Sequence, residues 1–206
     1  MNWNNTKTAV VAGVSLLLAA VTGVVIFYSR VTPVRGIPKG WSAISGDADQ
    51  WEWINGDIRA HSSKGETILA STREYHNVTL SVWAGTTNRE ASLAFRMRNA
   101  DNGYIVIFGP AGTPCPWNEN GFIGLIRKTS GQEVTLRSYS GRIFSTIGQS
   151  AKIAVTAKGP WIAVRLNDVT IFRVADTNYS SGFIGLRIFG TEEYPCDATF
   201  SRLIFH

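Results

Sequence analysis

Cysteine and histidine are scarce in this chain of 206 residues, which contains only two cysteines and three histidines. Cys115 and Cys196 form no CxxC pair, and His61, His76 and His206 lack the spacing of metal ligands. The sequence therefore predicts no metal centre of the zinc type. A calcium ion held by loop oxygens of Asp101, Asn102, Asn118 and Glu119 stays open, although these residues lack the spacing of an EF-hand. The sequence also contains no P-loop and no nucleophile elbow, so neither a bound cofactor nor a serine hydrolase is expected.

Charged residues are also few, at 17% of the chain. Residues 1–40 contain four basic residues and no acidic one, whereas residues 41–206 contain the other 16 basic residues and all 15 acidic ones. The net charge of +5 thus arises near the N-terminus and not on a globular face. A nucleic-acid-binding domain would show a basic stripe interleaved with aromatics, so no nucleic acid is expected as a partner.

A long uncharged run, TAVVAGVSLLLAAVTGVVIFY, covers residues 8–28 after a short tail of residues 1–7. It would span about 30 Å as a helix, the thickness of a bilayer core. Trp3 precedes the run, and Phe27 and Tyr28 end it, as in the aromatic belts of membrane helices. A cleaved signal peptide is the alternative, although its apolar region is normally shorter. We predict a single transmembrane helix over residues 8–28.

Small residues recur every four positions in this segment, at Ser15, Ala19 and Gly23 and again at Ala9 and Gly13. Such faces let helices approach closely in lipid. They predict contact with another transmembrane helix. The alternative is that glycine and alanine are simply common in membrane helices.

Two observations bear on the orientation of this helix. Arg30, Arg35 and Lys39 follow it, which weakly favours a cytoplasmic C-terminal domain, but these side chains can instead contact anionic lipid headgroups. Cys115 and Cys196 lie in Pro-flanked loops and are expected to form one disulfide, which needs an oxidising compartment. We therefore predict a cytoplasmic N-terminus and an extracytoplasmic domain, periplasmic or extracellular.

Residues 29–40 contain two prolines and two glycines and are predicted to be a linker. Residues 41–206 consist of short β-type runs separated by turn residues, with no convincing helical period. NVTLSVWA, for example, places Val78, Leu80 and Val82 on one face and Trp83 on the other. The pattern predicts an all-β, antiparallel jelly-roll β-sandwich preceded by the transmembrane α-helix.

Two further patterns give specific predictions. ASLAFRMR sets Leu93, Phe95 and Met97 against Arg96 and Arg98, and Asn167–Asp168 in RLNDVTIF predicts a two-residue hairpin. The pentapeptide GFIGL occurs twice, at 121–125 and 182–186. The neighbouring arginines place Phe122, Gly124 and Ile126 inward in the first copy and Ile184, Leu186 and Ile188 inward in the second. The copies are then expected to bury opposite faces.

The ordered series KIAVTAKGPWIAVRLNDVTIFRV, SSGFIGLRIFG and ATFSRLIF, together with WEWINGDIRAHS and NGYIVIF, resembles the concanavalin A-like lectin/glucanase jelly rolls. The nearest group is that of the 3-keto-disaccharide hydrolases (domain of unknown function 1080) and laminin-G-like domains. The resemblance implies two stacked, curved sheets whose concave face often binds sugars. The acidic E-x-D-x-x-E signature of the glucanase branch is absent.

Candidate binding residues are few. Trp117, Asn118 and Glu119 lie in a predicted rim loop, where an aromatic beside amide and carboxylate groups suits a sugar or a protein partner. The alternative is that Trp117 caps the sandwich edge. Trp83 is a second candidate for an outward aromatic. The core is expected to contain the following tryptophans: Trp51, Trp53 and Trp161.

Paired carboxylates for glycoside hydrolysis are not evident, because Glu52 and Asp57, five positions apart, would face opposite sides of one strand. The main hypothesis is a membrane-anchored, non-catalytic scaffolding or binding subunit. Its partners would be lipid, other transmembrane helices and extracytoplasmic subunits of a complex, for which an energy-converting assembly is one candidate host. The alternatives are a surface-tethered carbohydrate-binding module and a glycoside hydrolase of the keto-disaccharide type.

Overall fold

The computed structural model of the chain describes these residues: 34–86, 89–109, 121–141 and 150–206. They belong to one compact unit that begins at Val34 and ends at His206. Within the described ranges no helix is both long and apolar enough to cross a bilayer. The membrane segment predicted at residues 8–28 lies outside the described residues and remains a prediction.

The described chain is almost entirely β-structure, with one short 3-10 helix, η1 (Ala48–Gln50). The strands are β1 (Val34–Arg35), β2 (Trp41–Ser45), β3 (Trp51–Ile54), β4 (Asp57–Ser62), β5 (Gly65–Tyr75), β6 (Val78–Thr86), β7 (Ala91–Asn99), β8 (Asn102–Gly109), β9 (Phe122–Thr129), β10 (Gln132–Ser140), β11 (Ser150–Lys158), β12 (Trp161–Leu166), β13 (Val169–Ala175), β14 (Gly182–Gly190) and β15 (Cys196–Phe205).

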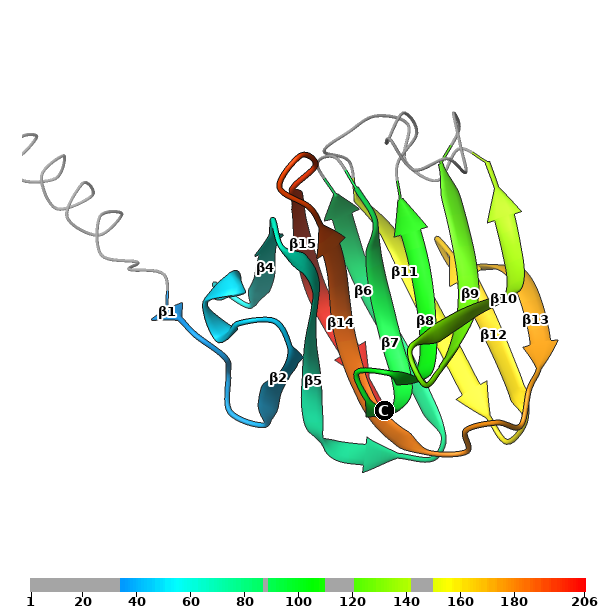
Figure 1. Cartoon of the computed structure of the whole chain (residues 1–206). Coiled ribbons are helices and arrows are strands. Elements are labelled where there is room, and N and C mark those ends of the chain that lie inside the picture. The colour runs from blue at the N-terminus through cyan, green and yellow to red at the C-terminus, as the bar shows by residue number, and fades with distance from the viewer. Residues whose placement is uncertain (1–33, 87–88, 110–120, 142–149) are drawn as a thin grey trace, which may run out of the picture. The chain divides into compact units, whose positions relative to one another are not determined.

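These strands form two stacked antiparallel sheets (Figure 1). One sheet has eight strands in the order β1-β3-β4-β15-β6-β11-β12-β13, and the other has seven in the order β10-β9-β8-β7-β14-β5-β2. The predicted all-β sandwich is confirmed, and its topology is that of a jelly roll. The sheets are called below the eight-stranded and the seven-stranded sheet.

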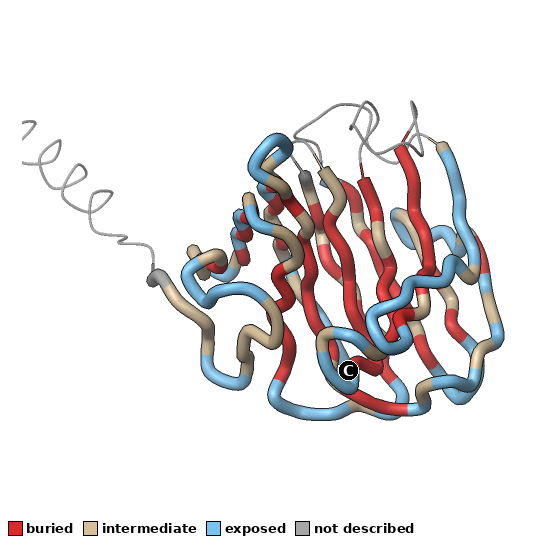
Figure 2. Tube along the Cα trace, viewed as in Figure 1, coloured by how far each residue is buried: buried red, intermediate tan, exposed pale blue. Residues whose placement is uncertain are grey.

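The main core lies between the two sheets and is built by alternate residues of each strand. In β6, Leu80, Val82 and Ala84 are buried, whereas Ser81 and Trp83 between them are only partly covered. Successive side chains of a strand point to opposite faces, so one set fills the core and the other faces outward. Figure 2 shows buried positions along the middle of both layers.

The two GFIGL copies bury the same face, so the prediction of opposite faces is wrong. The inward residues of the two copies are Ile123 and Leu125 in β9 and Ile184 and Leu186 in β14. The assignment failed in β9 because it treated Arg127 as a solvent-facing residue. Arg127 instead lies on the inner face at the end of the strand, where its Nη1 lies 2.7 Å from Asp176 Oδ2. A partly buried ion pair thus permits an arginine on the core side.

Arg96 is a second departure from simple alternation. It is buried, its φ is 50°, and it lies within a bulge of β7, whereas the pattern placed it in solvent. Its guanidinium donates hydrogen bonds to the main-chain oxygens of His76, Gly159 and Tyr179. Burial lowers the pKa of Arg96. The bulge therefore points the Arg96 guanidinium inward, where its hydrogen bonds hold three turns of the sandwich together.

Three hairpins use the left-handed region at both turn residues. Asn167–Asp168, with φ of 48° and 69°, joins β12 to β13 as predicted. Asn55–Gly56, with φ of 53° and 88°, joins β3 to β4, and Ser130–Gly131, with φ of 49° and 80°, joins β9 to β10. All three are turns in which positive φ at two positions matches the twist of the strands.

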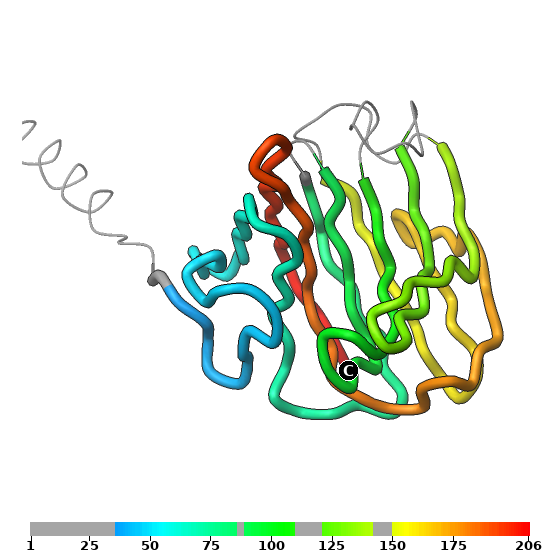
Figure 3. The backbone as a smooth tube through the Cα atoms, viewed as in Figure 1, coloured from blue at the N-terminus to red at the C-terminus, as the bar shows by residue number. Residues whose placement is uncertain are grey.

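Both ends of the described chain are built into the sandwich. Strand β1 pairs with β3, and Ile37 packs against the main core, so residues 34–40, which the sequence assigns to the linker, belong to the compact unit. The last strand, β15, lies between β4 and β6, where the red end of the chain enters the eight-stranded sheet (Figure 3).

Cys196, at the start of β15, is a free thiol buried in the main core. Its Sγ donates a hydrogen bond to the Glu90 main-chain oxygen at 3.4 Å, and burial raises its pKa to about 12. Cys115 lies outside the described residues. In the described part of the chain Cys196 is packed as a small apolar group, and its predicted disulfide with Cys115 remains a prediction.

Candidate functional site

The outer face of the eight-stranded sheet carries an aromatic ring, Trp83, near its middle. Trp83 lies on β6, opposite Lys152 of β11 on one side and Ser201 of β15 on the other. The residues on either side of it in β6, Val82 and Ala84, point into the core. The predicted outward position of Trp83 is therefore confirmed, and its side chain is only partly covered.

A bulge in β15 brings Arg202 onto this ring. The pairing with β6 shifts after Ser201, and Arg202 has a φ of 51°. A non-glycine residue in this region costs roughly 1 kcal/mol or more, a strain that tends to occur at functional sites. The Arg202 guanidinium carbon lies 5.8 Å from the centre of the Trp83 ring. This cation–π contact fixes the guanidinium beside the ring.

Two hollows share Trp83 as part of their wall. The first, of about 530 Å³, is lined chiefly by polar side chains of β3, β4 and β15: Glu52, Arg59, His61, Asp197, Thr199 and Ser201. The second, of about 560 Å³, is lined by Asp57, Ser150, Ser201 and Arg202. Volumes of this size are typical of sites for small molecules or for one or two units of a polymer.

The polar groups of the first hollow are paired across neighbouring strands. His61 Nδ1 lies 2.8 Å from Asp197 Oδ1, and both side chains are about half exposed. Arg59 of β4 stands opposite Glu52 of β3. Hydrogen-bond donors and acceptors are thus held on a regular sheet beside an aromatic ring. This combination can bind a ligand that has many hydroxyl groups and an apolar face.

Glu52 and Asp57 both line these hollows, although the sequence predicted that they face opposite sides. The prediction assumed one continuous strand, whereas the Asn55–Gly56 turn places the two carboxylates on neighbouring strands. Hydrolysis would need a carboxylic acid with a raised pKa. The carboxyl groups for which a clear shift is found, Glu66 and Asp176, both have lowered pKa values. They also lie outside the Trp83 hollows.

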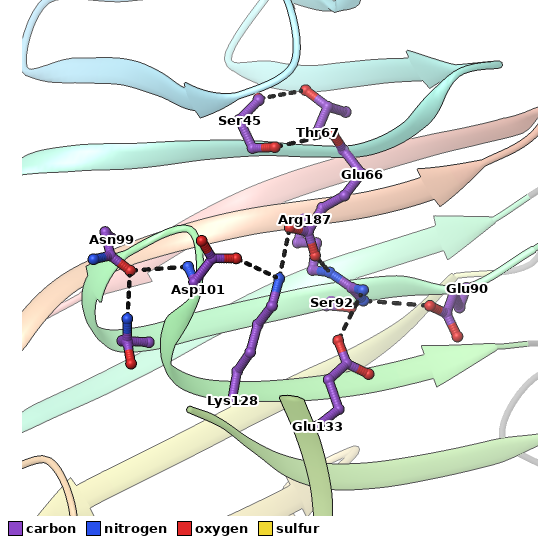
Figure 4. A network of polar contacts seen from close by, with 11 residues as sticks. Ser45, Glu66, Thr67, Glu90, Ser92, Asn99, Asp101, Lys128, Glu133 and Arg187 are labelled. Atoms are coloured by element: carbon purple, nitrogen blue, oxygen red, sulfur yellow. Dashed lines mark hydrogen bonds and ion pairs between the residues drawn. The ribbon is translucent and has the colours of Figure 1, made fainter. Parts of the chain in front are cut away.

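The outer face of the seven-stranded sheet carries a cluster of charges, drawn in Figure 4. The Arg187 side chain, only 6% exposed, bonds to three carboxylates, with Nη1 lying 3.3 Å from Glu90 and Nη2 3.2 Å from Glu133. Its Nε binds Glu66, which also accepts from Lys128 Nζ at 2.8 Å. Arg187 Nη1 also lies 3.5 Å from Ser92 Oγ of β7, so the cluster joins strands β5, β7, β9, β10 and β14.

The charges of this cluster stabilise one another. Burial alone would raise the pKa of Glu66, but the charges of Arg187 and Lys128 outweigh it, so the pKa is lowered. Burial would likewise lower the pKa of Arg187, but Glu66, Glu90 and Glu133 raise it. A guanidinium that already bonds three carboxylates has little capacity left for a ligand. We interpret the cluster as a group of ion pairs that stabilises the seven-stranded sheet, and not as the binding site.

Most of the other predicted site residues lie outside the described ranges. Lys39 is exposed, and Arg35 belongs to β1. Among the described residues no group of three His, Cys, Asp or Glu side chains could hold a metal ion. The residues outside the described ranges are Trp117, Asn118, Glu119, the small residues Ala9, Gly13, Ser15, Ala19 and Gly23, and Arg30.

Two parts of the Trp83 site were not found from the sequence. The position of Arg202 depends on a bulge, which alternation of apolar residues does not reveal. The His61–Asp197 pair joins strands 136 positions apart. The one available signal was the alternation in DIRAHS, which places Arg59 and His61 on the face opposite Ile58.

No protein-family model matches the chain, and no curated protein matches it in sequence. Solved structures do resemble it. A carbohydrate-binding module, CBM66 from Bacillus subtilis, superposes with a TM-score of 0.66 at 17% identity, covering 81% of this chain and 95% of that one. The Bacillus licheniformis β-glucanase gives a TM-score of 0.57 at 11% identity, covering 82% and 93%.

The exoplasmic/lumenal domain of VIP36, solved in a Ca²⁺/Man3GlcNAc-bound form, gives a TM-score of 0.56 at 10% identity, covering 80% of this chain and 83% of that one. At such low identities the likeness establishes the fold alone. The described part of the chain is a jelly-roll β-sandwich, similar in fold to these three proteins.

Proposed function

We propose that the β-sandwich is a carbohydrate-binding domain, and that it holds a glycan on the outer face of the eight-stranded sheet with Trp83 as the stacking platform. The observation that carries the proposal is the partly covered Trp83 ring, which borders two hollows lined mainly by polar residues. The known structures of similar fold include sugar-binding proteins, which supports the choice of ligand.

This proposal replaces a scaffolding role as the main hypothesis. A scaffold surface would be expected to present an apolar core surrounded by a polar rim. The face around Trp83 instead presents separate hydrogen-bonding groups and a single ring, which suits a small polar ligand. We also propose that residues 8–28 tether the domain to a membrane and that it faces the extracytoplasmic side, where it would meet glycans. The apolar run and the proposed ligand support this placement.

Binding of a panel of neutral and acidic oligosaccharides, measured by calorimetry and by tryptophan fluorescence, tests the proposal. We expect Trp83→Ala to weaken glycan binding about tenfold or more, because both the stacking and the buried apolar area are lost. Arg202→Ala should weaken it a few-fold through loss of the cation–π contact. Tyr139→Ala, which removes an exposed aromatic from edge strand β10, serves as the matched control.

Circular dichroism and the thermal midpoint of each variant show whether it is folded. The proposal fails if the folded wild-type protein binds no saccharide of the panel. It fails equally if a folded Trp83→Ala variant binds as tightly as the Tyr139→Ala control.

A further inference from the structure

A second tryptophan lies exposed on the same outer face. Trp161, expected in the core, has 55% of its surface exposed, because it starts β12 on the outward side while its neighbour Ile162 points inward. Trp83 and Trp161 therefore belong to one face of the eight-stranded sheet.

The turn that carries Trp161 is held rigidly from three directions. Gly159 N–H donates to Asn77 Oδ1 at 3.0 Å, and the Gly159 oxygen accepts from Arg96 Nη2 at 2.8 Å. The Pro160 oxygen accepts from Asp176 N–H at 2.9 Å. The ring therefore stands on a fixed support, and little conformational entropy is lost when a ligand packs against it.

A hollow of about 610 Å³ lies against the Trp161 ring. Small side chains, Thr156 and Ala163, line it together with the longer Lys158 and Arg173. Small neighbours leave the ring accessible from the side. The hollow can thus take a flat group that stacks on the indole.

The charge of this hollow has one sign. Lys158 and Arg173 are both exposed, and within the described ranges neither forms an ion pair. Lys152, further along β11, is paired with Asp168, whereas Lys158 and Arg173 at the Trp161 end are not paired in this way. Two basic side chains flanking an aromatic ring favour an anionic ligand.

The two tryptophans are separated by a distance that a chain of several sugar units can bridge. Lys152 stands opposite Trp83, and Lys158 stands opposite Trp161, six positions along β11. This corresponds to about 20 Å along the strand. Two outward residues of β11 between the rings, Ala154 and Thr156, are small. The longer Arg165 of β12 is held by a hydrogen bond from its Nη2 to Thr156 Oγ1.

We propose that Trp161, Lys158 and Arg173 form a second subsite, and that the ligand is an acidic glycan chain whose neutral end stacks on Trp83 while a carboxylate- or sulfate-bearing unit stacks on Trp161. The inference rests on the proposed function of the Trp83 site. It adds the chemical class of the ligand and a direction for the chain along the sheet.

The test uses the full chain in detergent, with hexamers of galacturonate and of mannuronate as probes. The methyl esters of the same hexamers serve as neutral counterparts, and the dimers serve as short probes. The variants are Trp161→Ala and the double variant Lys158→Gln/Arg173→Gln. The matched control is Lys39→Gln/Lys64→Gln, which removes two exposed charges elsewhere. Affinities are measured by calorimetry at low salt and at 0.5 M salt, a concentration at which exposed charges are largely screened.

At least one acidic hexamer should bind more tightly than its ester. The double variant should reduce that preference about tenfold, as high salt should, while the control leaves it unchanged. Trp161→Ala should weaken hexamer binding several-fold and leave binding of the methyl-ester dimers, added as neutral short probes, unchanged, since a neutral dimer binds at Trp83 alone.

Two results would overturn the second subsite while leaving the proposed function intact. In one, saccharides bind through Trp83, but neither the acidic group nor Trp161 matters. In the other, the variants change only the association of the domain with phosphatidylserine in nanodiscs, which would identify lipid as the ligand of this hollow. Absence of any saccharide binding, in contrast, contradicts the proposed function itself.

Discussion

At the scale of single residues, Arg187 has the largest expected effect on stability. Its side chain is nearly buried and bonds three carboxylates. Removal of one partner from a buried ion pair leaves uncompensated charge, which costs about 3–5 kcal/mol. We expect Arg187→Met to lower the free energy of unfolding in urea by that amount. Arg173→Met, a control at an exposed arginine, should change it by less than about 0.5 kcal/mol.

A loss of unfolding free energy below about 1 kcal/mol for Arg187→Met would contradict the interpretation that the cluster stabilises the seven-stranded sheet. It would mean that Glu66, Glu90 and Glu133 relax toward solvent when their partner is removed. The cluster would then be a surface feature available to a ligand.

Cys196 allows a second prediction at this scale. A native disulfide typically contributes 2–5 kcal/mol, whereas an unpaired surface cysteine can be replaced at little cost. Since Cys196 is a free thiol in the core, Cys115→Ser should change the free energy of unfolding by less than about 0.5 kcal/mol. Unfolding is followed without reductant and again with dithiothreitol. A large loss of unfolding free energy that appears only without reductant would show that Cys115 and Cys196 form a disulfide.

At the scale of strands, the alternation of apolar and polar residues predicted the positions of the strands correctly. It was less reliable in predicting which face of a strand is buried. In β6 the predicted inner face is correct, because only one face of that strand packs in the core. In β9 the outer face is also covered, since Ile126 and Lys128 are buried there as well. A strand that is buried on both faces has no polar face that would identify the solvent side. The prediction therefore took the face of Arg127 in β9 as the outer one, which is wrong.

The candidate site could be predicted only in part for a related reason. Trp83 was found because it interrupts a row of Ser and Thr on a clear outward face. Trp161 was missed because hydrophobicity alone assigned it to the core, although it is the first residue of its strand. The partner of Trp83, Arg202, depends on a bulge that is set by packing between distant strands.

The hairpin between β3 and β4 gives a prediction for one element. Gly56 has a φ of 88°, and a Cβ at this position would meet no atom within 4 Å. Gly56→Ala should therefore cost about 1–2 kcal/mol through backbone strain alone. Asn55→Gly, which keeps positive φ available, is the control and should be nearly neutral. The measurement is the urea midpoint of each variant.

The same substitution should also affect the Trp83 site, because Glu52 and Asp57 reach it from the two strands of this hairpin. We expect weaker glycan binding in Gly56→Ala than in Asn55→Gly. Equal stability and equal binding of the two variants would show that the turn does not constrain the site.

At the scale of the whole molecule, the outer faces of the two sheets carry different kinds of groups. Internal ion pairs occupy the outer face of the seven-stranded sheet, whereas hollows and two aromatic rings mark that of the eight-stranded sheet. A ligand would therefore be bound on one broad side of the sandwich.

The tether itself gives the last prediction. If residues 8–28 span a bilayer, the full chain should stay with membranes after extraction at alkaline pH, and a chain that begins at Val34 should be released. A control that inserts two arginines in the middle of residues 8–28 should abolish membrane retention, because charges there are costly in lipid. Labelled acidic hexamer should bind intact cells only when the domain faces outward and Trp83 is present. Release of the full chain by alkali would contradict the tether, and binding that requires cell lysis would reverse the orientation.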